Sequence, residues 1–159
     1  MSTSRYRLDL VGPFGLFGPD DTRIEISSKK SMALISLLAT SPGGQRTRQF
    51  LRNMLWENAS EKMAQDSLRR ELSNLRKILR KAQADHLLTT QMQRIGLSVD
   101  DIDVDIDQIA INSVSHPFSV NGEFLEGIDL PNAERFEDWL REERSRIDDL
   151  ISEDIKHNE

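Results

Sequence analysis

The segment of residues 61–81 restricts the possible folds of this chain more than any other part of it. At 100° per residue, five apolar side chains fall on one stripe of a helix: Ala64, Leu68, Leu72, Leu75 and Leu79. The opposite face carries Asp66, Arg70, Ser73, Asn74, Lys77 and Lys81, and one flank carries Arg69, Arg76 and Arg80. Seven Lys or Arg residues stand against three acidic ones. The segment predicts a long helix whose basic side is either simply solvated or binds an anionic partner.

The elements on either side of this helix favour the second interpretation. Ser27 and Ser28 are suitable amino-terminal caps for a helix over residues 29–40, and Thr47 can cap a shorter helix over the apolar residues of 50–56. A short helix, a break and a longer basic helix follow the order of a helix-turn-helix, whose second helix enters the DNA major groove. Residues 86–90 and 95–99 then predict two strands joined by a polar turn, where a wing would lie.

The amino-terminal residues predict a small β-sheet. Apolar and polar side chains alternate over residues 6–17, glycines and prolines interrupt the run, and a second strand is expected over residues 22–26. The glycines of GPFGLFG do not predict a phosphate-binding loop, because no Gly-Lys-Ser/Thr sequence follows them.

Charge is distributed unevenly along the chain, although its net charge is -6. Residues 1–100 contain 16 Lys or Arg and 10 Asp or Glu residues, whereas residues 101–159 contain 5 and 17. The basic part is compatible with a nucleic-acid partner. The acidic part is interpreted first as a solvated surface and second as a segment that competes with DNA or recruits a partner.

Several classes of function lack support in the sequence. The chain has no Cys, which excludes disulfides and thiolate catalysis, and His86, His116 and His157 lack the spacing of a metal-binding motif. No Gly-x-Ser-x-Gly motif is present. No apolar run is long enough to span a bilayer, and no secretory signal is apparent. We therefore expect a cytoplasmic protein that is not an enzyme and has no metal, no cofactor and no membrane partner.

Three sequence segments, in this order, resemble the regulators related to SARP and AfsR, which join an OmpR-like winged helix to a bacterial transcriptional activator domain. The first is LDLVGPFGLFG together with EISSKKSMALISLLATSPGG, the second is SLRRELSNLRKIL, and the third is FLEGIDLPNAERFEDWLREERSRI. The resemblance implies an α+β fold: a winged helix-turn-helix with a small amino-terminal β-sheet, a carboxy-terminal hairpin wing and a helical appendage. It places the winged helix at residues 1–104 and the acidic helical segment at residues 105–159.

The resemblance also implies a site for double-stranded DNA and hence transcription regulation. The recognition helix would use Arg69, Arg70, Ser73, Asn74, Arg76, Lys77 and Arg80. Arg can bind guanine and Asn can bind adenine with two hydrogen bonds, while Lys and the flanking Arg side chains neutralise phosphates. Ser28, Thr47 and Arg48 near helix starts and Gln93 and Arg94 in the wing turn are expected to contact the DNA backbone. Asp66 and Glu71 depart from the family's pattern, and Glu71 is expected to pair with an Arg or Lys one turn away.

The carboxy-terminal third leaves more alternatives open. Residues 101–107 alternate Asp with Ile or Val, which predicts an edge strand or the entry to a short helix through Ile111. A helix over residues 133–155 has an apolar stripe of Phe136, Leu140, Ile147, Leu150 and Ile151, with Trp139 at its border. That stripe is expected to fold back on the winged helix, with homodimer formation or continuation in a longer protein as the other outcomes.

The functional prediction is a sequence-specific regulator of transcription that binds double-stranded DNA, with residues 61–81 in the major groove. The wing over residues 86–99 would lie on the backbone or in the minor groove. RNA polymerase and a second copy of the chain, bound through the carboxy-terminal helix, are candidate partners. The alternative is a winged-helix module that binds protein and little or no DNA.

Overall fold

The amino-terminal sheet joins the two ends of the predicted winged helix. In the computed structural model, which describes residues 5–107 and 122–157 and side chains up to residue 152, β1 (Tyr6–Asp9) pairs antiparallel with β2 (Gly15–Phe17). On its other edge β1 pairs parallel with β6 (Ile102–Val104). The expected short helix through Ile111 extends outside the described residues.

The strand predicted over residues 22–26 does not form. Only Arg23 makes an isolated bridge, to Phe17, and the amide of Ile24 donates to the carbonyl of Leu16 at 2.8 Å. Ile24 and Ile26 are buried, so their alternation reflects packing on the core and not a continued hydrogen-bonded ladder. The chain then passes directly to the cap of the first helix.

Three helices follow and begin and end close to the predicted positions. They are α1 (Lys29–Ala39), α2 (Arg48–Leu55) and α3 (Glu61–Lys81). The hydroxyls of Ser28, Thr47 and Ser60 accept a backbone N–H two or three residues into each helix and so stabilise its first turn. The predicted apolar stripe of α3 is buried along its whole length, from Ala64 to Leu79. These predictions are confirmed.

The wing contains one strand more than the hairpin predicted. Strand β5 (Arg94–Leu97) lies between β4 (Leu88–Thr90) and the short β3 (Gln45–Thr47), which precedes α2. The first predicted strand begins later than expected, because residues 85–87 form a 3-10 turn. Gly44 before β3 has a φ of 70°, and a Cβ atom there would lie 2.4 Å from the carbonyl oxygen of Leu97, so the strand can approach β5 only with glycine at this position.

The carboxy-terminal segment folds back on the rest of the chain, as expected. After β6 residues 105–107 are helical, so both alternatives for residues 101–107 occur in succession. The segment around Phe124 lies against the amino-terminal sheet, where the amide of Leu125 donates to the carbonyl of Leu10 at 2.7 Å. Helix α5 (Glu134–His157) packs against α2, and Phe136, Leu140 and Ile147 belong to the same hydrophobic core as the winged helix.

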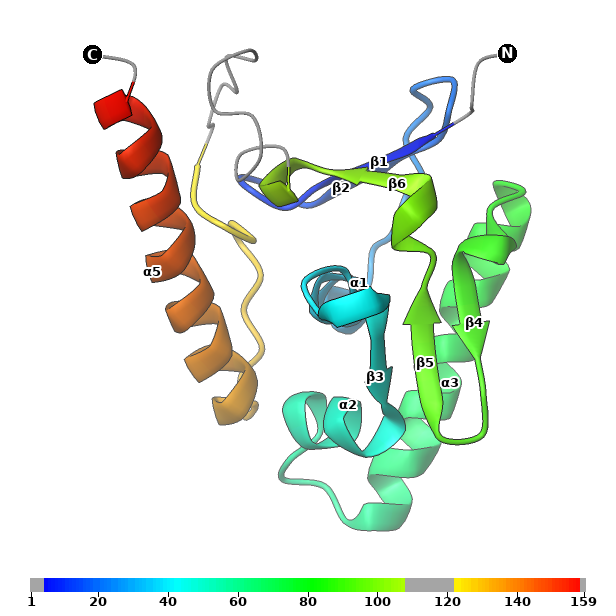
Figure 1. Cartoon of the computed structure of the whole chain (residues 1–159). Coiled ribbons are helices and arrows are strands. Elements are labelled where there is room, and N and C mark those ends of the chain that lie inside the picture. The colour runs from blue at the N-terminus through cyan, green and yellow to red at the C-terminus, as the bar shows by residue number, and fades with distance from the viewer. Residues whose placement is uncertain (1–4, 108–121, 158–159) are drawn as a thin grey trace.

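The fold is therefore α+β: a winged helix-turn-helix with a small amino-terminal sheet, a hairpin wing and a helical appendage. Figure 1 shows α3 and the β4–β5 hairpin on one side of the molecule and α5 on the other, with α1 and α2 between them. In the described part of the chain no helix has the length and apolar character needed to cross a membrane. The division into domains at residue 104 stays a prediction, since one hydrophobic core spans both parts.

Candidate nucleic-acid interface

The outward face of α3 is the centre of the candidate interface. Arg70, Ser73, Asn74 and Lys77 are all exposed there, opposite the stripe that α3 buries against α1 and α2. Within the described residues, none of these four side chains makes a hydrogen bond or an ion pair with the rest of the chain. The predicted site residues at the middle of α3 thus present donors and acceptors to an outside partner at a rigid helical spacing.

The flank of α3 faces the wing, and Arg76 is engaged there. Its guanidinium donates to the carbonyl of Leu88 at 3.1 Å and to the hydroxyl of Thr90 at 3.2 Å. Arg76 therefore holds strand β4 against the helix in this structure. Arg69 and Arg80 lie near Asp66 and Asp85 at 3.7 and 4.0 Å, in exposed pairs that are weak in water.

The start of α2 is joined to the turn of the wing. The amide of Arg48 donates to the carbonyl of Gln93 at 2.8 Å, and its Nε donates to the carbonyl of Gln91 at 2.9 Å. The Thr47 hydroxyl caps α2, and Thr47 lies opposite Arg94 in the β3–β5 register. Four of the five predicted backbone contacts outside α3 are thus brought together at one end of the molecule: Thr47, Arg48, Gln93 and Arg94.

A hollow of about 370 Å³ lies between α2 and this turn. Its lining consists of Thr47, Arg48, Gln49, Arg52, Met92 and Gln93. Burial lowers the pKa of the Arg48 guanidinium, and the nearby charges of Arg69 and Arg52 lower it further. Three arginines that repel one another make this region strongly positive, and such a region is suited to a phosphate group.

Three lining residues of this hollow were missed in the sequence, namely Gln49, Arg52 and Met92. A helical wheel of α2 had the signal for Arg52, which lies one turn after Arg48. The sequence contained no such signal for Met92, because local periodicity does not encode the position of a turn residue relative to another helix.

Glu71 does not face the interface, and the expectation that it pairs with Arg or Lys is wrong. Its carboxylate accepts hydrogen bonds from the hydroxyls of Ser28 and Ser31, the latter at 2.8 Å. The Ser28 hydroxyl, which also caps α1, is thereby used inside the protein, against its prediction as a DNA contact. Glu71 joins the middle of α3 to the start of α1 and so helps to fix the orientation of α3.

An internal cation, Lys30, holds α1 to α2. The amine of Lys30 donates to the carbonyl of Leu55 and lies 4.7 Å from the centre of the Trp56 ring. Burial lowers the pKa of this amine, and the charge of Glu71 opposes the shift. Lys30 therefore belongs to the scaffold of the helix-turn-helix and not to its basic surface.

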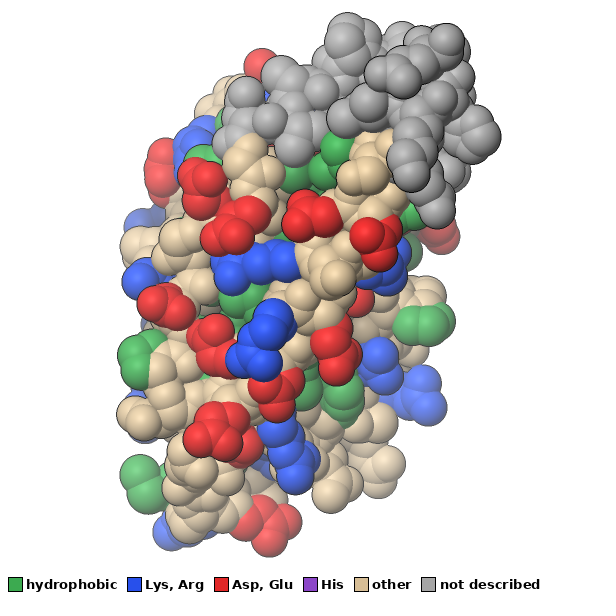
Figure 2. Space-filling model, turned by 90° about the vertical axis from the view of Figure 1, so that its left-hand side faces the viewer, with side chains coloured by type: hydrophobic (Ala, Val, Ile, Leu, Met, Phe, Trp, Pro, Cys, Tyr) green, Lys and Arg blue, Asp and Glu red, His purple; other side chains and the backbone are tan. Residues whose placement is uncertain are grey.

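Helix α5 is attached beside the turn between α2 and α3 without covering α3. Glu57 accepts a hydrogen bond from the amide of Arg135 at 2.8 Å, and the Asn58 amide donates to the carbonyl of Asn132 at 2.9 Å. Figure 2 views the molecule from the α5 side, where acidic and basic side chains alternate. This face lies across the molecule from the wing (Figure 1).

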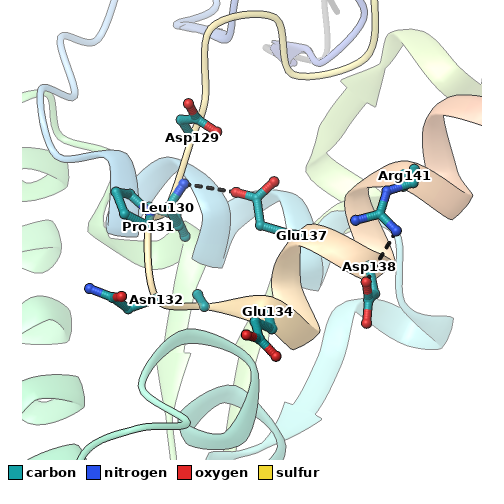
Figure 3. Close-up of a pocket in the computed structure, with 9 residues that line it drawn as sticks. Asp129, Leu130, Pro131, Asn132, Glu134, Glu137, Asp138 and Arg141 are labelled. Carbon is teal, nitrogen blue, oxygen red and sulfur yellow. Dashed lines mark hydrogen bonds and ion pairs between the residues drawn. The ribbon is translucent and has the colours of Figure 1, made fainter.

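A separate hollow of about 440 Å³ lies at the start of α5 (Figure 3). It is lined largely by acidic and neutral groups, and several of these already have partners. Glu137 accepts the amide of Leu130 at 2.9 Å, and Asp138 pairs with Arg141 at 3.3 Å. An acidic hollow of this kind repels phosphate and lies outside the candidate interface. In the described residues no three His, Asp or Glu side chains are grouped for a metal ion.

The fold and this surface define a winged helix-turn-helix protein. The chain resembles EmbR of Mycobacterium tuberculosis, solved in complex with a low-affinity phosphopeptide, with a TM-score of 0.66 and 20% sequence identity. The match covers 95% of this chain and 45% of that one, so this chain spans less than half the length of that protein. No protein-family model matches the sequence. A search of curated proteins also finds no match.

Proposed function

We propose that this chain is a transcriptional regulator that binds double-stranded DNA in a sequence-specific way. Helix α3 enters the major groove, and the wing lies on the backbone or in the minor groove. The observation that carries the proposal is the outward face of α3, where Arg70, Asn74 and Lys77 have no partner among the described residues. Arg and Asn at adjacent turns of one face suit the edges of guanine and adenine.

The hollow between α2 and the wing supports the same orientation. With α3 in the major groove, the cluster of Arg48, Arg52 and Arg69 would meet the sugar-phosphate backbone beside it. The arginines would neutralise phosphate charges and release the counterions bound to them. This release would stabilise the contact and make its affinity depend on salt concentration. The resemblance to the SARP and AfsR regulators, and the likeness in fold to EmbR, favour the same class.

In the alternative, a winged-helix module that binds protein, the acidic carboxy-terminal segment would either dock a partner or mask the basic face. Helix α5 instead packs against α2, and its stripe of Phe136, Leu140 and Ile147 is buried in the chain's own core. A homodimer through α5 would therefore have to use its outer, charged face. That dimer and the contact with RNA polymerase stay predictions.

The test is a titration of fluorescent random-sequence duplex DNA with the whole chain, followed by anisotropy at a series of salt concentrations. We expect binding at low salt and a linear fall of log affinity with log salt concentration. A specific duplex selected from a random library should then bind about 10³-fold or more tightly than the random pool. Absence of binding at low salt would refute the proposal in favour of the protein-binding module.

A further inference from the structure

The two exposed methionines lie on the elements of the candidate interface. Among the side chains that the structure describes, the large apolar ones with high exposure are Met63 and Met92, at 63% and 90%. Met63 is in the first turn of α3, and Met92 is the middle residue of the wing turn. Figure 1 shows the start of α3 and the wing turn at the same end of the molecule, away from both chain termini.

Met92 is held out from the surface by a rigid turn. The amide of Gln91 donates to the carbonyl of Arg94 at 2.8 Å, and Arg48 occupies the carbonyls of both Gln91 and Gln93. The backbone on each side of Met92 is thus held by hydrogen bonds, and the Met92 side chain at the tip is 90% exposed. The same side chain borders the hollow that holds Arg48 and Arg52, so it lies beside the expected phosphate contact.

The turn carries no charge at its tip. Gln91, Met92 and Gln93 are neutral, and the first cation is Arg94 in β5. A neutral tip gains little from the negative potential of the minor groove, whereas an unbranched, polarizable side chain can fill its floor or wedge between bases. A·T pairs leave that floor open, and the guanine N2 amino group obstructs it.

Met63 lies at the start of α3, the helix that is expected to enter the major groove. It precedes Arg70 by two helical turns and therefore lies on the same outward face of α3. The amino-terminal residues of a recognition helix approach base edges most closely. An apolar side chain there suits the thymine methyl group, which projects into the major groove.

We propose that Met63 and Met92 form the apolar part of the DNA interface: Met63 contacts thymine methyl groups in the major groove, and Met92 enters the minor groove at A·T pairs. The proposal rests on the proposed DNA-binding function and adds to it a preference for A·T pairs that no charged residue of the interface supplies. Desolvation of a thioether on the DNA gives affinity without neutralising a phosphate, so this contribution is independent of salt.

The experiment uses the whole chain and the duplex that the wild type selects from a random library, made in three forms. One is unmodified, one has uracil for thymine, and one has 2,6-diaminopurine for adenine. Uracil lacks only the major-groove methyl group, and 2,6-diaminopurine adds only the minor-groove amino group while keeping the N6 donor and the N7 acceptor. The variants are Met63→Gln and Met92→Gln, with Met63→Leu and Met92→Leu as matched apolar controls.

On the unmodified duplex each Gln variant should bind about tenfold more weakly than the wild type, with the same salt slope, and each Leu variant should bind within a fewfold of the wild type. Uracil should weaken binding by the wild type and by Met63→Leu but leave binding by Met63→Gln unchanged. 2,6-Diaminopurine should weaken binding by the wild type and by Met92→Leu but leave binding by Met92→Gln unchanged. All variants should unfold at the wild-type temperature, because both side chains are exposed.

Two results would overturn the inference while leaving the proposed function intact. One is wild-type affinity of both Gln variants for the selected duplex. The other is a loss that is equal on all three duplexes or is shared by the Leu variants. Failure of the wild type to bind any duplex at low salt would refute both the proposed function and this inference.

Discussion

The outward face of α3 and the face of α5 both carry basic side chains, but they differ in whether those charges have partners. On α5, Arg135, Arg141, Arg144 and Arg146 all lie within 4.0 Å of a carboxylate. On α3, Arg69 and Arg80 at the flank have such partners, but Arg70 and Lys77 on the outward face have none among the described residues. A cation already paired within its own chain gains less from phosphate than an unpaired one. The local pairing of charge, and not its amount, therefore distinguishes the candidate DNA surface from the surface that holds α5.

The comparison assigns α5 a structural role, and its largest test is Phe136→Ala. Phe136 is fully buried and packs against Trp139, with ring centres 5.4 Å apart. Its truncation should lower the free energy of unfolding by about 3–5 kcal/mol, because a cavity remains in the shared core. Urea unfolding of the whole chain measures this. A loss below about 1 kcal/mol would mean that α5 is only loosely attached.

Asp105 tests whether the acidic third is merely solvated surface. Its carboxylate accepts the amides of Leu10 and Val11 at 2.9–3.1 Å, yet burial raises its pKa to about 6 from an ordinary value of 3.8. The folded state therefore binds more protons than the unfolded state between these two values. The contribution of Asp105 to stability should be largest below pH 3.8 and should fall by about 3 kcal/mol as pH rises through 6.

The measurement is urea unfolding of the wild type and Asp105→Asn from pH 4 to 7. The stability of the wild type relative to the variant should decrease over this range. A difference that is constant with pH would place Asp105 among the solvated carboxylates, and an increase would mean that folding lowers its pKa.

On the opposite face, Arg70→Ala and Asn74→Ala should weaken binding to the selected duplex by about 1–3 kcal/mol each. Stability should stay within about 0.5 kcal/mol of wild type, because both side chains are exposed. The matched control is Arg141→Ala on α5, which removes the same charge from the other face and should leave DNA affinity unchanged. Equal losses in Arg70→Ala and Arg141→Ala, with none in Asn74→Ala, would indicate that only net charge matters and would remove the distinction between the two faces.

The smallest expected effect concerns the hollow between α2 and the wing. Arg52→Ala should reduce the slope of log affinity against log salt concentration by about one unit. It should also weaken binding to all duplexes to a similar extent. Anisotropy titrations on random and selected duplexes measure both quantities. An unchanged slope would mean that the cluster of Arg48, Arg52 and Arg69 lies away from the phosphates.

Much of the fold could be predicted because it depends on residues close together in the chain. The caps Ser28 and Thr47 and the stripe of α3 place three helices through spacing alone. The strand expected over residues 22–26 does not form, because its formation depends on more than the local sequence. Alternating apolar residues show which side chains are buried, but a strand also requires a neighbouring backbone, and Arg23 alone finds one.

The candidate site was predicted less completely. The outward side chains of α3 follow from its helical periodicity, and the structure leaves Arg70 and Asn74 exposed as expected. Arg76 and Glu71 lie on the flanks, where their partners are Leu88 of the wing and the serines at the start of α1. Those partners belong to other elements, so a helical wheel of α3 could not identify them.

By itself the sequence determined the helices, their caps, the buried stripe of α3 and the separation of basic and acidic segments, since each depends on neighbours within a few turns. The tertiary structure decided the parallel pairing of β1 with β6, the addition of β3 to the wing, and the packing of α5 against α2. It also brought Arg52 and Met92 to one hollow. These contacts join residues far apart in the chain, and their formation depends on how the whole core packs, which no local period encodes.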